Sequence, residues 1–113
     1  MKPEEKVVEL LKKHQLKLTT IESCTAGAIA ARIVDVPGAS EVFEQGFVTY
    51  SNEAKMRAVK VQKEVFEKYG AVSEKCAEEM VRGGLLEAKA DIAVSATGFA
   101  GPSGGWEAPV GTV

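Results

Sequence analysis

The sequence predicts an α/β fold, a three-layer α/β/α sandwich with a mostly parallel (mixed) sheet. Segments with the spacing of amphipathic helices alternate along the chain with short runs of β-branched and aromatic residues. Such alternation is typical of parallel strands joined by crossover helices. A chain of 113 residues is long enough for one domain with its own core. We therefore expect a single domain over residues 1–113.

The first half of the chain contains two predicted strands. Pro3, followed by two glutamates, opens an amphipathic helix. A β-branched run then stops at small residues, and a helix of small residues follows until Pro37-Gly38 ends it. The expected elements are a helix from Pro3 whose last turn holds His14, a strand over Leu16–Ile21, a helix over Ala26–Val36 with Ile29, Ile33 and Val34 in the core, a connector over Ala39–Phe43, and a strand over Gly46–Ser51.

Serines and glycines mark the element boundaries of the second half. Ser51 and Ser73 are typical helix N-caps, and Gly70 is suited to ending a helix. Gly83-Gly84 inside a helix costs about 1 kcal/mol per glycine relative to alanine, so we expect close packing there. The expected elements are a helix after Ser51, a helix over Gln62–Tyr69, a helix over Glu74–Ala88 with Cys76 in the core, a strand over Asp91–Ala96, and the start of another strand at Gly111–Val113.

Composition and charge argue against several classes of function. Fourteen Lys and Arg residues balance 16 Asp and Glu residues without a basic block, so a nucleic-acid partner is not expected. No apolar run approaches the roughly 20 residues of a membrane span, and the N-terminus is a poor signal peptide. We expect a cytoplasmic protein that does not bind membranes. Cys24 and Cys76 lack a C-x-x-C motif or a His/Cys cluster, which argues against a disulfide framework or a structural zinc site.

The segment Thr19 to Gly27, T-T-I-E-S-C-T-A-G, is the strongest candidate for a functional site. A strand that runs into a helix presents hydroxyl groups beside helix N–H groups, which can hold a phosphate or a developing oxyanion. Ser23, Tyr50 and Thr97 each end a predicted strand, so we expect them at the carboxyl edge of the sheet, where ligands bind in such folds. The alternatives are that Ser23 only caps the helix, that Tyr50 is a core-edge aromatic, and that Lys55 is a solvated helix residue.

Several motifs in a fixed order resemble one known family. E-S-C-T-A-G, G-F-V-T-Y-S-N-E-A-K, G-A-V-S-E, and T-G-F-A-G-P-S-G-G followed by P-V-G-T-V are similar to the C-terminal domain of the competence/damage-inducible CinA proteins. That family includes stand-alone nicotinamide-nucleotide amidases, and the resemblance extends from about Val7 to Val113. It implies hydrolysis of the carboxamide of nicotinamide mononucleotide to nicotinate mononucleotide and ammonia, without a metal ion or a cofactor.

The resemblance also implies roles for individual residues. The serine of E-S-C-T, Ser23, would be the nucleophile, and the tyrosine and lysine of T-Y-S-N-E-A-K, Tyr50 and Lys55, would assist it. A serine hydroxyl attacks readily only when a neighbour takes its proton, and a partly desolvated lysine can be neutral enough to do so. N–H groups at the start of the helix after Ser23 would bind the oxyanion. The residues expected to line the pocket are Cys24, Thr25, Ser40, Thr97, Gly98, Gly101, Ser103 and Gly104.

The chain departs from the family pattern in three places. Ala26 stands where relatives usually have a second glycine, and the glycine loop is one residue shorter, with Trp106 and Ala108 near where a lysine normally precedes the proline. The family domain also continues past P-V-G-T-V into a further strand and a helix. We therefore expect a homo-oligomer in which a neighbour covers the surface that those elements would cover. A second hypothesis is a nucleotide-binding or interaction module without turnover, and a third, weaker one is a thiol enzyme that uses Cys24.

Overall fold

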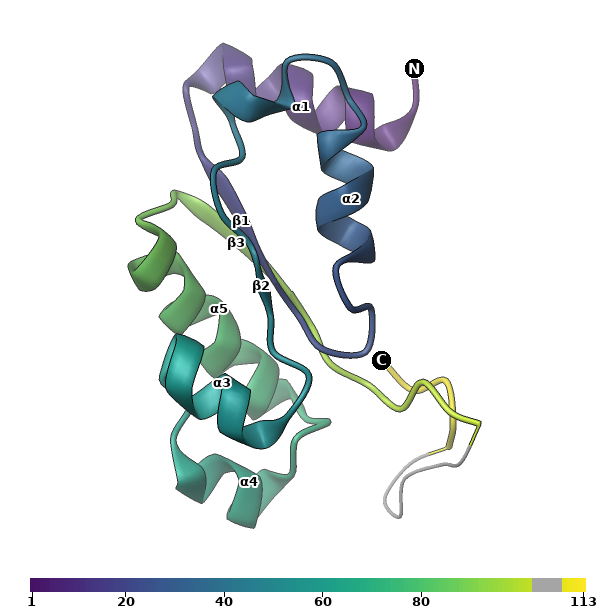
Figure 1. Cartoon of the computed structure of the whole chain (residues 1–113), viewed down its shortest axis with the longest axis vertical. Coiled ribbons are helices and arrows are strands. Elements are labelled where there is room, and N and C mark those ends of the chain that lie inside the picture. Colours follow the sequence, from purple (N-terminus) through teal and green to yellow (C-terminus); the bar gives the residue numbers. More distant parts are fainter. Residues whose placement is uncertain (103–108) are drawn as a thin grey trace.

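A parallel sheet of three strands forms the centre of the computed structural model (Figure 1), which describes residues 1–102 and 109–113. β1 (Leu18–Glu22) is the middle strand, with β2 (Phe47–Val48) on one side and β3 (Ile92–Ala96) on the other. Both neighbours run parallel to β1. The predicted α/β fold with a parallel sheet is therefore confirmed.

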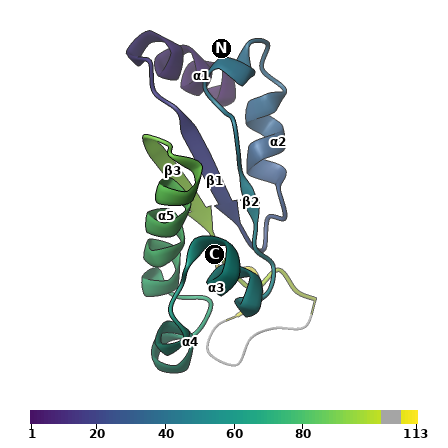
Figure 2. The same ribbon diagram turned by 60° about the vertical axis from the view of Figure 1, so that its left-hand side comes forward.

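Helices cover both faces of the sheet (Figures 1 and 2). α1 (Pro3–His14), α2 (Ala28–Val34) and the short 3-10 helix η1 (Ala39–Glu41) lie on one face, and α3 (Asn52–Val59), α4 (Lys63–Tyr69) and α5 (Glu74–Ala88) lie on the other. The core is divided in the same way. The first cluster, on the α2 side, comprises Val8, Leu11, Leu18, Ile33, Ala39 and Val42. The second cluster, on the α3 side, comprises Ile21, Val59, Val61, Val65, Cys76 and Met80.

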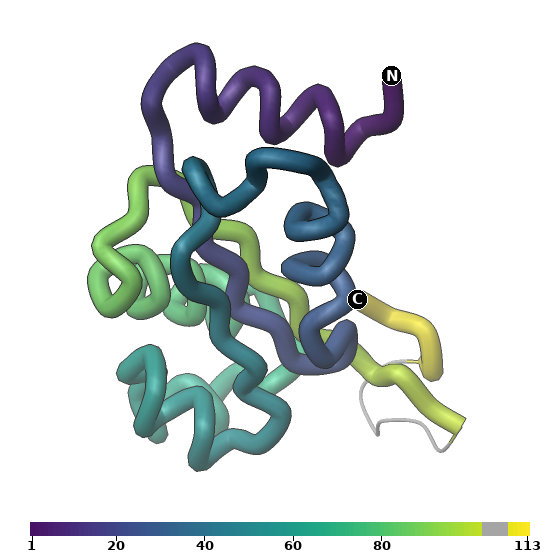
Figure 3. The backbone as a smooth tube through the Cα atoms, turned by 45° about the horizontal axis from the view of Figure 1, so that its top comes forward, coloured from purple at the N-terminus to yellow at the C-terminus, as the bar shows by residue number. Residues whose placement is uncertain are grey.

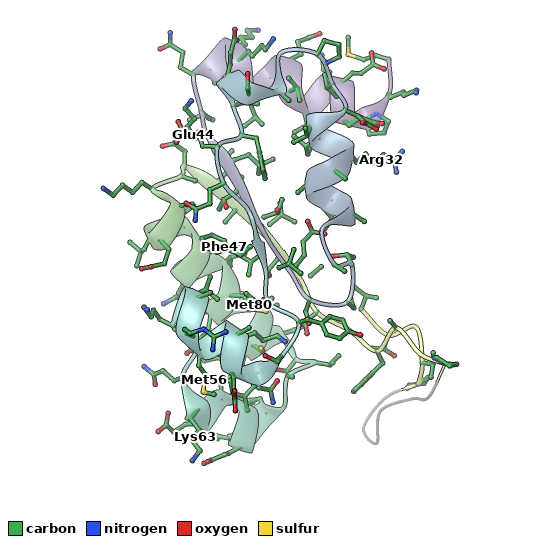
Figure 4. All side chains as sticks on the ribbon, in the orientation of Figure 1. Arg32, Glu44, Phe47, Met56, Lys63 and Met80 are labelled. Atoms are coloured by element: carbon green, nitrogen blue, oxygen red, sulfur yellow. The ribbon has the colours of Figure 1, made fainter. Side chains whose placement is uncertain are left out.

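β1 is buried along its whole length because it contributes side chains to both clusters. Successive side chains of a strand point to opposite faces, so Leu18 lies in the first cluster and Ile21 in the second. Phe47 of β2 packs against the same second cluster that contains Met80 of α5 (Figure 4). The face that carries Ile21 is therefore also the face of Ser23, two residues further on.

Two adjacent glycines bring α5 close to both neighbouring elements. A Cβ atom on Gly84 would overlap the side chain of Ile21 in β1, and a Cβ atom on Gly83 would overlap the carbonyl oxygen of Val59 at the end of α3. The expected close packing is confirmed, and it involves a helix end as well as a strand. The two glycines therefore let the backbone of α5 lie directly against the Ile21 side chain of β1 and against the Val59 carbonyl of α3.

Gly83→Ala is expected to lower the free energy of unfolding, because the new methyl group would overlap a backbone oxygen that cannot move without displacing α3. Overpacking costs typically about 1–3 kcal/mol, and the better helix propensity of alanine returns about 1 kcal/mol of this. Urea denaturation measures the difference. The control is Glu87→Ala, an exposed position of α5, where we expect a change within about 0.5 kcal/mol. A Gly83→Ala protein more stable than wild type would contradict the close approach.

β2 and α2 are each four residues shorter than the sequence predicts. β2 ends at Val48 instead of Ser51, and α2 covers Ala28–Val34 instead of starting at Ala26. The start of α2 is delayed because the turn after β1 extends to Gly27, whose φ of 98° is left-handed. Val34, predicted to lie in the core, is 58% exposed. Within the part of the chain that the structure describes, no helix has the length and apolar character needed to cross a membrane.

The sequence predicts the start of a strand at Gly111–Val113, but the structure has a turn and irregular chain there. The N–H of Phe99 donates to the Thr112 carbonyl oxygen, and the Phe99 carbonyl oxygen accepts from the N–H of Gly111. Figure 3 shows this segment, in yellow, next to the chain that leaves β3. The prediction of a strand at this position is therefore wrong.

Candidate active site

A serine and a buried lysine meet at the carboxyl end of β1. Ser23 directly follows β1, and Lys55 lies in α3, which starts shortly after β2. Lys55 is only 2% exposed, and its Nζ donates a hydrogen bond of 3.1 Å to Ser23 Oγ. Ser51 caps α3 by accepting from the Ala54 N–H at 3.0 Å, which fixes where the helix begins. The local sequence S-N-E-A-K thus places Lys55 over Ser23.

The environment of Lys55 favours its neutral form. Burial lowers the pKa of Lys55 from its ordinary value of 10.5, because an ammonium group loses its hydration inside the protein. The thiol groups of Cys76 and Cys24 act in the opposite direction, with a smaller effect. The ion pairs among the described residues do not include Lys55. Lowering its pKa increases the fraction of free amine, which is the form that can accept a proton from a serine hydroxyl.

Three hydroxyl residues lie in a row at this edge, one after the end of each strand. The pairing of β1 with its neighbours continues one residue beyond the strands, so the members of this hydroxyl row are Thr49, Ser23 and Thr97. Thr97 Oγ1 donates to the Ala71 carbonyl at 2.8 Å. Thr49 Oγ1, by contrast, is buried and has no hydrogen-bond partner among the described residues. The three hydroxyl groups therefore differ in their hydrogen bonds: Thr97 bonds to a backbone carbonyl, Ser23 to Lys55, and Thr49 to no described residue.

The structure places Tyr50 and Ser40 outside the hydroxyl row. β2 ends earlier than predicted, so Thr49 takes the position beside Ser23, and Tyr50, the next residue, is 70% exposed. Ser40 is exposed in η1, which lies near the amino end of β1. Neither residue takes part in the contact between Ser23 and Lys55. The roles that the family resemblance implies for Tyr50 and Ser40 stay predictions.

A buried carboxylate that the sequence analysis did not single out, that of Glu22, holds the turn after β1. Its Oε1 accepts from the Thr25 hydroxyl at 2.6 Å, from the Gly27 N–H at 3.2 Å and from the Ile29 N–H at 2.9 Å, and its Oε2 accepts from the Ala30 N–H at 2.9 Å. Burial opposes ionisation, but these hydrogen bonds outweigh it and lower the pKa of Glu22 below its ordinary value of 4.5. Glu22 is thus a fixed internal anion.

The N–H groups at the start of α2 are therefore not available to an oxyanion, which corrects the expectation from the sequence. The Glu22 carboxylate already occupies the position that an external anion would take at the helix N-terminus. Nor does Ser23 cap the helix, because the N-cap is Gly27. The N–H groups of Cys24 and Thr25, directly after Ser23, donate to no described residue. The sequence did contain a signal for Glu22, since acidic residues favour helix N-termini.

A cavity of about 370 Å³ opens beside Thr97, between the start of α5, the end of β3 and residues 112–113. Gly98 and Gly101 lie in the segment that leaves β3, but neither of them lines this cavity. Ser103 and Gly104, which the resemblance assigns to the pocket, lie outside the described residues. Over residues 1–102 and 109–113, no three potential metal ligands gather in one place.

Comparison with known proteins identifies the family to which a chain with this site belongs. The model of the CinA C-terminal domain matches residues 1–113. The chain belongs to the CinA C-terminal domain family. A CinA-like protein from Chloroherpeton thalassium is 54% identical over 111 residues, which are 97% of this chain and 26% of that protein. The chain thus spans about a quarter of the length of this CinA-like relative.

Solved structures of CinA proteins share the fold. The competence damage-inducible protein A (ComA) from Klebsiella pneumoniae has a TM-score of 0.93 at 39% identity, over 96% of this chain and 68% of that one. A CinA superfamily protein from Escherichia coli has a TM-score of 0.92 at 38% identity, over 96% of this chain and 63% of that one. These names describe CinA proteins by competence and damage, and none of them states a reaction.

Proposed function

We propose that this CinA domain hydrolyses the carboxamide of nicotinamide mononucleotide to nicotinate mononucleotide and ammonia. The observation that carries the proposal is the contact of 3.1 Å between Ser23 Oγ and Nζ of the buried Lys55, whose pKa is lowered. A hydroxyl beside a base of this kind is the arrangement of an activated nucleophile. The geometry supports acyl transfer in general, and the choice of substrate follows from the resemblance to the nicotinamide-nucleotide amidases of the family.

Lys55 acts first as a base and then as an acid in the proposed reaction. The neutral Nζ accepts the Ser23 hydroxyl proton while Oγ forms a bond to the amide carbon, and the carbonyl oxygen becomes an oxyanion near the N–H groups of Cys24 and Thr25. The Lys55 ammonium then gives its proton to the amide nitrogen, the C–N bond breaks, and ammonia leaves. Water attacks the resulting ester with Lys55 again as base, which releases the carboxylic acid product and restores the Ser23 hydroxyl.

Several further expectations belong to the same proposal. Tyr50 would relay a proton or orient Lys55, as the family resemblance implies, although it would have to turn inward from its exposed position. A pyridine nucleotide as the small-molecule partner, a homo-oligomer and a cytoplasmic location also stay predictions. The oligomeric state and the location are independent of the contact between Ser23 and Lys55.

Ammonia release from nicotinamide mononucleotide by the purified protein tests the proposal. We expect one ammonia per nicotinate mononucleotide, at a rate that rises with pH through a pKa below 10.5. Lys55→Met should lower the rate about 100-fold or more, since general base catalysis contributes that much. Lys63→Met, at an exposed position of α4, is the control and should keep the rate.

Two outcomes would contradict the proposal. Turnover in Lys55→Met at the wild-type rate would show that another group is the base. Binding of the mononucleotide without ammonia release would favour the nucleotide-binding module, in which the fold and the pocket are present without turnover.

A further inference from the structure

Two buried polar groups at the edge of the sheet have unused hydrogen-bonding capacity. Thr49 is 1% exposed, and its Oγ1 has no partner among the described residues. Lys55 Nζ bonds to Ser23 alone among those residues, although even a neutral amine carries two N–H groups. Buried polar groups are nearly always paired, and leaving one unpaired costs about 1–3 kcal/mol. Both groups therefore require an explanation.

The register of the sheet places Thr49 on the side of Lys55. The Thr49 N–H donates to the Glu22 carbonyl at 2.7 Å, so Thr49 stands beside Ser23 on the neighbouring strand, at the spacing of about 4.8 Å that separates strands. Phe47, two residues earlier, packs against the second cluster, on the α3 side, and side chains two residues apart share a face. The hydroxyl of Thr49 and the amine of Lys55 therefore flank Ser23 on the same face.

We propose that Thr49 is the positioning residue for Lys55. The two side chains form no hydrogen bond in the structure, but a rotation of either one would let the Thr49 hydroxyl oxygen accept one N–H of the amine, so that the Nζ lone pair points at the Ser23 hydroxyl. A base must lie within reach of the proton and be aligned with it. One fixed N–H restricts rotation about the last bond of the lysine side chain and so restricts the direction of the lone pair. The inference rests on the proposed function and extends it to a residue that forms no bond with the substrate.

The same contact would also change the titration of Lys55. Hydrogen bonds from an ammonium are stronger than those from a neutral amine, so removing the acceptor should lower the pKa of Lys55 further. The other titratable groups that act on Lys55 are the thiols of Cys24, in the turn after β1, and of Cys76, in α5. A substitution at Thr49 leaves both thiols in place.

Thr49→Val and Thr20→Val form a matched pair for the first test. Thr20 is also fully buried with an unpartnered Oγ1, but it precedes Ile21 in β1 and therefore lies on the opposite face of the sheet. We expect kcat of Thr49→Val to fall on the order of 10-fold, with KM nearly unchanged. Thr20→Val should keep kcat, and Thr49→Ser, which retains the hydroxyl, should restore most of it. Thr20→Val should keep or raise Tm, because a methyl group replaces an unpaired hydroxyl. Thr49→Val should lower Tm slightly, because one N–H of the buried Lys55 amine loses its acceptor.

The second readout does not depend on turnover. NMR of protein with isotope-labelled lysine side chains follows the titration of Lys55, and its midpoint should move to lower pH in Thr49→Val and stay in place in Thr20→Val and Thr49→Ser. If the wild-type protein releases no ammonia but the Lys55 midpoint still shifts in Thr49→Val, the proposed function is overturned and the role of Thr49 is supported. An unchanged midpoint in folded Thr49→Val, or a loss confined to KM, would overturn the inference.

Discussion

Ser23→Ala protein is expected to release no measurable ammonia from nicotinamide mononucleotide while it keeps its fold. Its hydroxyl oxygen is the atom that bonds to the amide carbon, and removing a nucleophile of this kind lowers kcat by at least about 1,000-fold. The fold should persist because the lost atom lies at a turn. The free energy of unfolding should fall by no more than about 1–3 kcal/mol, since the buried Lys55 Nζ loses its hydrogen-bond partner. An ammonia assay and circular dichroism measure the two effects.

Two control variants separate the nucleophile from its neighbours. Ser95→Ala removes a serine that donates to the Ala77 carbonyl at 2.8 Å, so it should cost about 1 kcal/mol of stability and leave turnover in place. Cys24→Ala should also keep turnover, whereas a thiol enzyme would lose it. Ser23→Ala protein with the wild-type rate would show that Ser23 is not the nucleophile.

Glu22→Ala is expected to destabilise the protein by about 3 kcal/mol or more. The substitution leaves three partly buried backbone N–H groups and the Thr25 hydroxyl without their acceptor, and hydrogen bonds to a charged group contribute about 1.5–3 kcal/mol each. Urea denaturation measures the loss. Turnover should fall as well, since the same carboxylate holds the turn that begins at Ser23. A stability within about 0.5 kcal/mol of wild type would contradict the role of Glu22.

Glu22 should also make the fold sensitive to acid. Its pKa is lowered below 4.5 in the folded protein, so the unfolded chain binds the proton more readily. The stabilisation is therefore fully present above the unfolded pKa and is lost as pH falls through the folded pKa. Glu22→Gln, which cannot titrate, should lack this part of the acid dependence. Glu53→Gln replaces an exposed acidic residue in the first turn of α3 and should keep the wild-type acid profile.

The sequence predicted the features that depend on neighbouring residues. Ser51 and Ser73 are helix caps, as expected, because an N-cap needs only its own side chain and the N–H groups of the following turn. The close packing at Gly83-Gly84 was predictable because glycine inside a helix needs a steric reason. The α/β fold class followed from the alternation of helical and β-branched segments, which is also local.

Features that depend on contacts between distant segments were not predictable in this way. Residue composition alone favoured a solvated Lys55, and that alternative is wrong because α3 folds over the end of β1. The position beside Ser23 belongs to Thr49 instead of Tyr50, since the pairing of β2 decides which residue faces which side, and a shift of one residue reverses the face. Glu22 was missed because its acceptor role requires the exact path of the turn that follows it.

The glycine pair of α5 affects the spacing of Ser23 and Lys55, although its nearest neighbours are other residues. Gly84 touches Ile21, two residues before Ser23, and Gly83 touches Val59, one turn after Lys55. The strand that carries the hydroxyl and the helix that carries the amine are therefore spaced by a third element that supplies neither group. The length of a lysine side chain is fixed, so the distance between the backbone of α3 at Lys55 and the hydroxyl of Ser23 can vary only slightly if the two groups are to stay in contact. A substitution at either glycine would change the fit between base and nucleophile without altering a single atom that reacts.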